Sequence, residues 1–452
     1  MATEVKEFKT GKEDESKAHE SIESRDVPVD EAQKEALEEV VAAYTSAYNY
    51  TSQYYHDIWE DSWMAYNNQR TNAQYAGIAD NFVPETFTII ESIKANIIGG
   101  EQRFEYLPTR EDQKADTKAL NSLVEHYWYT NGFPAESLKW IQDDLVLGTG
   151  FLWTFWDSRR GVVPYYVPLR DNFIDPTAKN YKDARYAGFR YLTTIKELEG
   201  QTIVDENGKT VPRFMNLELA EDTIRDGGTD ELDKEIKDNL LGSTLDDEAK
   251  KDQVEVIYYI DKEKLVQVVN RQVVIEMVET PFKRDKKMVT SFDDAGNKVK
   301  FEMPEIHTFL PFAPARNYID GSLFYGRGDV EIILPSQELL NDTSSQKTDN
   351  LNYIVNKIAV VDPAFADESD KLDSIPGAKW FLPPGSVDWL NMQPLGADAD
   401  NEMNRIISSM RRATAADEII QGVNSGGRTT ATEIRAQLAQ AGTRFSIKLK
   451  NL

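Results

Sequence analysis

The sequence predicts an α+β fold in which helices and short β runs are spread over two or three domains. The chain has 452 residues, more than one domain usually holds. Several segments repeat apolar residues at helical spacing, whereas others are short apolar runs bounded by turn residues. Apolar residues make up 40% of the chain and aromatic residues 10%, which is enough for substantial cores.

Charge and composition exclude several classes of protein. With 77 acidic and 51 basic residues, the formal charge is −26, which argues against a simple cationic DNA-binding protein. The charge suits an ordinary acidic soluble protein, or one that lets DNA pass without gripping it. The chain has no cysteine, so disulfides and cysteine-ligated zinc are excluded. It also lacks an apolar signal core and an apolar run of about 20 residues, which predicts a cytosolic protein with no membrane partner.

The first part of the chain predicts a charged arm followed by helices. Residues 1–30 are charged and poor in aromatic residues, typical of a mobile acidic arm. A helical pattern begins at Val29, and the aromatic residues that follow it, from Tyr48 to Tyr66, are more typical of a core than of a ligand site. Three further helices are predicted, over Phe87–Ile98, Glu111–Trp128 and Pro134–Leu147.

The middle of the chain predicts short strands. The runs are Phe104–Pro108, Phe151–Trp156, Val162–Pro168, Tyr186–Thr193, Val254–Ile260 and Leu265–Val278, and a hairpin is predicted over Lys287–Phe301. The charged turn Asp261–Lys264 predicts that the fifth and sixth runs form a hairpin as well. The stretch Asp222–Asp252 is strongly acidic and predicts helical surface or an inserted excursion.

The most informative segment is Ser336–Tyr353, which has no glycine and no proline and therefore allows a helix. Its centre, Asn341–Asn350, contains no apolar residue, whereas a helix in a globular core needs an apolar stripe. Such a segment is a polar loop, a solvated linker, or a helix in a ring of copies beside a water-filled channel.

A small extended unit and a second helix follow. Residues 356–397 are mostly extended, and the helix is predicted over Asp398–Ile420, with Ile406 and Met410 on its apolar face. The glycine-rich loop Gly422–Arg428 then precedes a capping box at Thr430. The loop is either a plain connection between helices or a mobile loop at the end of the second helix. Arg411, Arg412 and Arg428 lie close to it in sequence, either as phosphate contacts or as a solvated helix end.

Motifs of catalysis are not recognisable in the sequence. The four histidines are too far apart for a local metal site, and no G-x-S-x-G or kinase motif is present. Gly148-Thr149-Gly150 precedes a strand instead of joining a strand to a helix, so it does not predict a nucleotide site. We therefore expect no catalytic residues, no metal and no cofactor.

The order of five segments over the chain resembles the portal proteins of tailed bacteriophages, of the broad family that includes short-tailed phages. These segments are Asp143–Asp157, Val167–Thr194, Pro311–Tyr353, Leu382–Leu390 and Gly422–Gln437. The resemblance implies a phage portal fold, a ring that is usually a dodecamer, and a place at one vertex of the capsid. It assigns residues 31–327 to a mixed α/β wing, 328–355 and 398–420 to two stem helices, 356–397 to a small α/β clip, 421–428 to a tunnel loop and 429–452 to the start of a helical crown.

The resemblance also implies partners and site residues. The ring would conduct double-stranded DNA without sequence specificity during packaging and ejection. The tunnel-loop residues facing DNA would be Gln421, Val423, Asn424, Ser425 and Arg428, with Arg411 and Arg412 as phosphate contacts. The clip, with Trp380, Phe381 and Trp389, would dock the terminase large subunit and later the tail adaptor. Capsid and scaffolding proteins would be further partners, and assembly would take place in the host cytoplasm before the protein becomes part of the virion.

Two other functions are weighed against this one. A carbohydrate-active virion enzyme would stack sugars on Trp59, Trp63, Trp153 and Trp156, and would need a carboxylate pair of perturbed pKa in the same cleft. A scaffolding or adaptor protein would bind such a ring without forming it, but the two helices flanking a small unit fit that function poorly.

Overall fold

The computed structural model describes residues 31–70, 78–98, 114–157, 159–204, 210–222, 253–280, 288–292, 298–302, 310–365 and 383–416. These residues form two compact units. The sheet unit comprises the described residues of 1–54, 167–313 and 321–324, and the helical unit those of 55–166, 314–320 and 325–452. The predicted arm 1–30, the predicted strand Phe104–Pro108 and the acidic residues after Asp222 lie outside the described residues.

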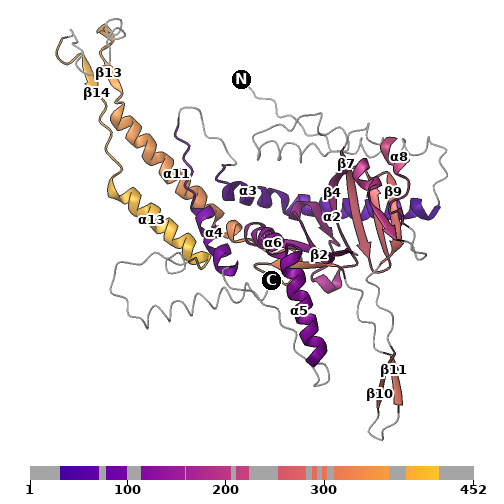
Figure 1. Cartoon of the computed structure of the whole chain (residues 1–452). Helices are drawn as coiled ribbons and strands as arrows, with labels where there is room; N and C mark the ends of the chain where they lie inside the picture. Colours follow the sequence, from indigo (N-terminus) through magenta and orange to yellow (C-terminus); the bar gives the residue numbers. More distant parts are fainter. Residues whose placement is uncertain are drawn as a thin grey trace. The chain divides into compact units, whose positions relative to one another are not determined.

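The sheet unit is built on one five-stranded antiparallel sheet (Figure 1). In sheet order its strands are β3 (Asn172–Ile174), β4 (Tyr186–Thr194), β7 (Gln253–Asp261), β8 (Lys264–Val269) and β9 (Val273–Glu279). Strand β7 lies in the centre, and its residues from Val254 to Ile260 are all buried. Both faces of this sheet must therefore be covered.

Helices cover the two faces. Helix α2 (Glu31–Tyr54) packs its residues Ala36, Val40, Tyr44 and Ala47 against one face. The other face is covered by the short helices α7 (Ile195–Glu199) and α8 (Leu217–Asp222), with Leu198 and Ala220 fully buried. Thr194 and Glu197 form a capping box that fixes the start of α7.

The strands predicted from the sequence in the sheet unit are confirmed with one exception. Strands β7 and β8 form the predicted hairpin, and β10 (Met288–Phe292) pairs with β11 (Lys298–Glu302) as expected. The single run Leu265–Val278 is wrong, because the chain turns at Asn270 and Arg271 and forms two strands, β8 and β9. Both turn residues have positive φ, 47° and 57°, a conformation that favours tight hairpins. Such turns usually contain glycine, but this one does not, so the sequence contains no signal for it. A further small hairpin joins β5 (Thr202–Val204) to β6 (Thr210–Pro212).

The helical unit contains most of the described helices and two small sheets. Its elements are α3 (His56–Tyr66), α4 (Glu85–Ile98), α5 (Lys114–Thr130), α6 (Phe133–Leu147), β1 (Thr149–Asp157), β2 (Gly161–Val167), β12 (Phe312–Arg316), α11 (Asp329–Val355), β13 (Ala359–Val361), β14 (Val387–Trp389) and α13 (Gly396–Ala413). Strand β1 lies between β2 and β12. Trp59 and Tyr66 of α3 are buried, as predicted for core aromatic residues. None of the described helices is long and apolar enough to cross a membrane.

Close backbone contacts join the end of α6 to the start of α11. Gly148 ends α6 with φ 88°, and a Cβ built there would lie 2.4 Å from the carbonyl oxygen of Gly326. A Cβ on Gly328 would lie equally close, 2.4 Å, to the carbonyl oxygen of Val146. Thr149 Oγ1 accepts a hydrogen bond of 2.9 Å from the Gly326 amide. The Gly148-Thr149-Gly150 motif is therefore a packing motif, since only glycine lets the two backbones approach this closely.

Candidate functional site

Helix α11 is one continuous helix of 27 residues from Asp329 to Val355. It begins before the polar segment Ser336–Tyr353 and runs through Pro335. Its first residue, Asp329, is fully buried and accepts hydrogen bonds from Asn317 Nδ2 (2.8 Å) and Tyr318 Oη (3.0 Å). The start of the helix is thus fixed inside the helical unit.

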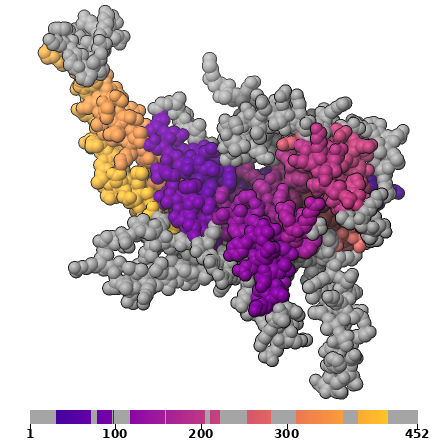
Figure 2. Space-filling view, viewed as in Figure 1, coloured from indigo at the N-terminus to yellow at the C-terminus, as the bar shows by residue number. Residues whose placement is uncertain are grey.

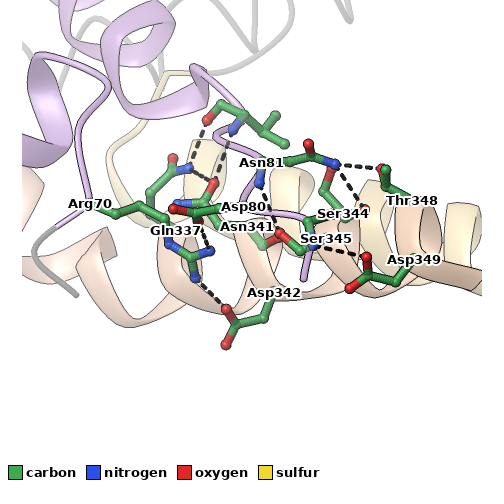
Figure 3. A network of polar contacts seen from close by, with 12 residues as sticks. Arg70, Asp80, Asn81, Gln337, Asn341, Asp342, Ser344, Ser345, Thr348 and Asp349 are labelled. Atoms are coloured by element: carbon green, nitrogen blue, oxygen red, sulfur yellow. Dashed lines mark hydrogen bonds and ion pairs between the residues drawn. The ribbon is translucent and has the colours of Figure 1, made fainter. Parts of the chain in front are cut away.

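The polar centre of α11 lies against another segment of the same chain. Gln337, Asn341, Ser345 and Asp349 are four residues apart and share one face of the helix. The segment Ile78–Thr86, which we call the strap, runs antiparallel along this face (Figure 3).

Each of the four side chains accepts a hydrogen bond from a strap amide. The donor–acceptor distances are 2.8 Å from Ala79 N to Asp349 Oδ1, 3.0 Å from Asn81 N to Ser345 Oγ, 2.9 Å from Val83 N to Asn341 Oδ1 and 3.1 Å from Thr86 N to Gln337 Oε1. The Asn81 side chain also donates to Thr348 Oγ1 and to the carbonyl oxygen of Ser344. We call this set of contacts the ladder.

The ladder depends on a match between two repeats. Two residues of extended chain advance by about 6.6 Å, and four residues of α-helix advance by about 6 Å. Ala79, Asn81 and Val83 therefore stay level with every fourth residue of α11, and the last step to Thr86 spans three residues into the start of α4. A helix face with polar acceptors at this spacing can satisfy an extended backbone much as a neighbouring strand would.

Gln337 is the most buried member of the ladder, with 1% of its surface exposed. Its Oε1 accepts from both the amide and the hydroxyl of Thr86, and its Nε2 donates to the carbonyl of Val83 and to Asn341 Oδ1. Thr86 lies in the first turn of α4, where backbone amides have no partner inside the helix. Gln337 therefore caps α4 from another helix.

Arg70 joins the exposed side of the ladder. Its guanidinium donates to Asp80 Oδ1 of the strap at 2.7 Å and also to Asp342 of α11. Burial alone would lower the pKa of Arg70, but the hydrogen bonds to the two carboxylates outweigh it and raise the pKa above its usual value. The pair of carboxylates is thus neutralised in part by a cation that stays charged.

The ladder explains the polarity of α11 within one chain. Sequence reasoning assigned the polar centre to solvent or to neighbouring copies, and it missed the strap as a partner. The signal in the sequence was the row of hydrogen-bonding side chains at positions 337, 341, 345 and 349. Its partner lies 264 residues away in the pair Asn81–Ser345, beyond the reach of any local pattern.

Helix α13 packs along α11 on a different side (Figure 2, yellow and orange). Ile406 and Met410 of its predicted apolar face are buried. Asn350 of α11 donates to the carbonyl of Gln393 at 3.0 Å and fixes the chain just before α13. The prediction that this helix runs to Ile420 is wrong: α13 ends at Ala413, and the chain leaves helical geometry at Ala415, whose φ is 61°.

Arg411 and Arg412, the two predicted phosphate contacts on α13, lie in different surroundings. Arg411 Nε donates to Glu85 Oε1 at the start of α4 across 2.7 Å, and both side chains are largely buried. Arg412 is exposed and lines a shallow groove between α13 and α11 with Arg405, Ser409 and Leu339. Phosphate contact by these two residues stays a prediction.

The remaining predicted site residues are only partly described. Strands β13 and β14 form a two-stranded antiparallel hairpin between α11 and α13. Trp389 lies on this hairpin with 38% of its surface exposed, next to the exposed side chains of Leu390 and Val360. Trp380, Phe381, Gln421, Val423, Asn424, Ser425 and Arg428 lie outside the described residues.

Two of the four tryptophans that the carbohydrate-enzyme hypothesis would use are buried. Trp59 and Trp153 have 2% and 0% of their surface exposed and belong to the core, so neither can stack a sugar. Trp156, in contrast, is 70% exposed. Within the described ranges, no group of three or more histidine, aspartate or glutamate side chains is placed to hold a metal ion.

Comparison with protein families decides the assignment. The family model described as "Phage P22-like portal protein" matches residues 41–413, which span both units. The chain belongs to the P22-like portal protein family. Its α+β fold, with a sheet unit and a helical unit that contains α11 and α13, is the fold expected for a portal protein. Membership also implies a portal role, as a component of the head-to-tail connection of a phage virion.

Other comparisons add less. No curated protein matches the chain. Among solved structures, a chain of the structure titled "Neck of empty GTA particle computed with C6 symmetry" matches with 10% identity and a TM-score of 0.36. The match covers 78% of this portal family member and 70% of the other chain. A similarity of this size supports no residue-level conclusion.

Proposed function

We propose that this portal family member forms a closed ring at one vertex of the capsid, through which double-stranded DNA is packaged and later ejected. The observation that carries the proposal is the family match over residues 41–413, which includes α11, α13 and the hairpin between them. In this proposal the protein is a conduit, and the terminase large subunit supplies the energy of packaging.

Helices α11 and α13 are the proposed stem. They lie side by side and are joined through the hairpin of β13 and β14, which is the proposed clip (Figure 1). Residues 31–327 are the proposed wing, 421–428 the proposed tunnel loop and 429–452 the proposed start of the crown. The exposed apolar residues of the hairpin, among them Trp389, support a docking role toward the terminase and the tail adaptor.

The charge of the chain supports passage of DNA without sequence-specific binding. A formal charge of −26 repels the phosphate backbone, so that DNA slides in place of adhering. A few arginines would provide transient contacts. Arg412 is the better candidate of the two on α13, because it is exposed whereas the Arg411 side chain is largely buried against Glu85.

Native mass spectrometry combined with negative-stain imaging tests the ring. We expect a closed ring of about a dozen copies with a central hole, the size usual in this family. If only monomers form when the capsid and scaffolding proteins are present, or if a compact small oligomer forms, the proposal is wrong.

Variants of the loop and of α13 test the conduit. Deletion of Val423–Gly427 should leave ring assembly intact and reduce the amount of packaged or retained DNA. Arg412→Ala should also reduce DNA retention without affecting assembly, with Lys262→Ala, an exposed cation on the turn between β7 and β8, as the control. If rings lacking the loop package and retain genomes normally, the tunnel loop has been assigned wrongly.

A further inference from the structure

Helix α11 is held in two different ways on either side of Pro335. Before the proline, Val330 and Ile333 are buried, and Asp329 is fixed by Asn317 and Tyr318. The close approach of Gly328 to Val146 adds a contact that leaves no room for movement. This proximal part, residues 329–334, is therefore tied rigidly to the rest of the helical unit.

Pro335 is a weak point in the backbone of the helix. Proline has no amide hydrogen, so the carbonyl of Glu331 receives no helical hydrogen bond from position 335. The ring of the proline also crowds the preceding turn, and helices bend most readily at such positions. The distal part, residues 336–355, therefore has a hinge at its base.

The strap spans from α4 to the distal part of α11 and holds it by polar contacts. Ala79, Asn81 and Val83 are bound there through hydrogen bonds to side chains, which exchange for hydrogen bonds to water at a small net cost. Such contacts separate more easily than a packed apolar interface, because opening exposes little apolar surface.

Burial changes along the ladder. At one end Thr86 and Gln337 have 0% and 1% of their surface exposed. At the other end Ala79 and Asp349 are only partly buried, although Asn341 and Ser345, between the two ends, have 2% of their surface exposed. Separation should begin where water already reaches the bonds and stop where both partners are buried.

We propose that the strap is a releasable brace on a hinged helix. It detaches from α11 beginning at Ala79 and stops at the Thr86–Gln337 contact. While it is detached, the distal part of α11 bends about Pro335 within the limit set by the Thr86–Gln337 contact. The inference concerns contacts within one chain and does not depend on the proposed passage of DNA.

Hydrogen exchange on the full-length assembled protein tests the opening. With residue-level mass spectrometry, we expect the protection factor to rise at least tenfold from the Ala79 amide to the Thr86 amide. The α11 amides from Asn341 to Asp349 should stay protected during strap opening, and low denaturant should leave strap exchange unchanged. If strap and α11 amides share one protection factor and one denaturant dependence, they open together and the brace is wrong.

An engineered disulfide provides a matched test. Because the chain contains no cysteine, the double variant Asn81→Cys/Ser345→Cys has a single disulfide to form. Oxidation should raise protection at Ala79 and Val83 at least tenfold, and reduction of the same sample should reverse most of the increase. If oxidation closes the disulfide without changing protection at these two amides, the strap does not open in the way proposed.

The hinge has its own test in Pro335→Ala, which alters no ladder contact. If strap opening is coupled to turning about position 335, a stiffer helix should raise strap protection severalfold relative to the wild type. Gln346→Ala, an exposed substitution on the distal part, is the control and should change nothing. Unchanged strap protection in Pro335→Ala would remove the hinge from the proposal.

Discussion

The two parts of α11 show how one helix can be held by opposite means. The proximal part is fixed by apolar burial and by glycines that bring two backbones into contact. At these glycines there is no space for even one Cβ atom. The distal part buries Leu340 and packs along α13, but its hold on the strap is the ladder, whose hydrogen bonds water can replace one by one. Packing thus makes one part intolerant of added volume, whereas hydrogen bonding makes the other sensitive to the loss of a partner.

The largest effect is expected at the glycine contact. Gly148→Ala should destabilise the protein by about 3–5 kcal/mol, because positive φ and an overlap with the Gly326 backbone are both unfavourable. Urea unfolding followed by tryptophan fluorescence measures this change.

The matched control is at the other end of the same helix. Gly132 precedes α6 with φ 77°, and a Cβ built there has no atom within 4 Å. Gly132→Ala should therefore cost only the strain of positive φ, about 1–2 kcal/mol. Equal losses for the two variants would mean that the close approach contributes nothing.

The next effect is expected at the buried end of the ladder. Gln337→Ala should lower the free energy of unfolding by about 1–3 kcal/mol, since it leaves the buried Thr86 amide without its side-chain acceptor and removes one of the two donors to the Val83 carbonyl. Gln346→Ala, on an exposed position of the same helix, should change it by less than about 0.5 kcal/mol. A small loss for Gln337→Ala would show that water replaces the side chain even at the buried end.

Sequence patterns predicted the elements with local signals and missed those without. Helix α6 was predicted through its end at Leu147 because Pro134 and Gly148 mark its two ends. The break between β8 and β9 was missed because Asn270 and Arg271 adopt positive φ without a glycine.

The candidate site was only half predictable. The polar row on α11 is visible in the sequence, but its partner is not, because a strap that binds through backbone amides leaves almost no trace in its own side chains. Val83, for example, contributes only its amide and its carbonyl to the ladder. The pairing of Arg411 with Glu85 of α4 was not predicted either, because the two residues are 326 positions apart in the sequence.

In the sheet unit, a buried carboxylate is held by a hydrogen bond from a charged side chain, whereas the ladder is held mostly by uncharged groups. The Asp175 side chain is fully buried and accepts from Arg185 Nε at 2.6 Å. Burial would raise the pKa of Asp175, but hydrogen bonds from Arg185 and Thr177 outweigh it and lower the pKa to about 2. Asp175→Asn should cost about 1–2 kcal/mol at neutral pH, somewhat less than the shift alone implies because Arg185 is mostly exposed.

The pH dependence of the stability difference between the wild type and Asp175→Asn tests whether the lowered pKa of Asp175 causes it. A carboxyl with a lowered folded pKa stabilises fully above its unfolded pKa, about 3.9, and loses that contribution as the pH falls through the folded value. The wild type and Asp175→Asn should therefore converge in stability between pH 4 and about 2. Asp183→Asn, at an exposed position nearby, should show no such convergence.

The smallest effect is expected at the end of α13, where a buried and an exposed ion pair can be compared. Arg411→Ala leaves the buried carboxylate of Glu85 without its guanidinium, although the first turn of α4 still favours a negative charge there. We expect a loss of about 1 kcal/mol in the free energy of unfolding. Arg405→Ala, which removes the exposed pair with Glu402, should give no measurable change. If the two variants are equally neutral, Arg411 is not committed to Glu85, and it becomes as good a candidate for DNA contact as Arg412.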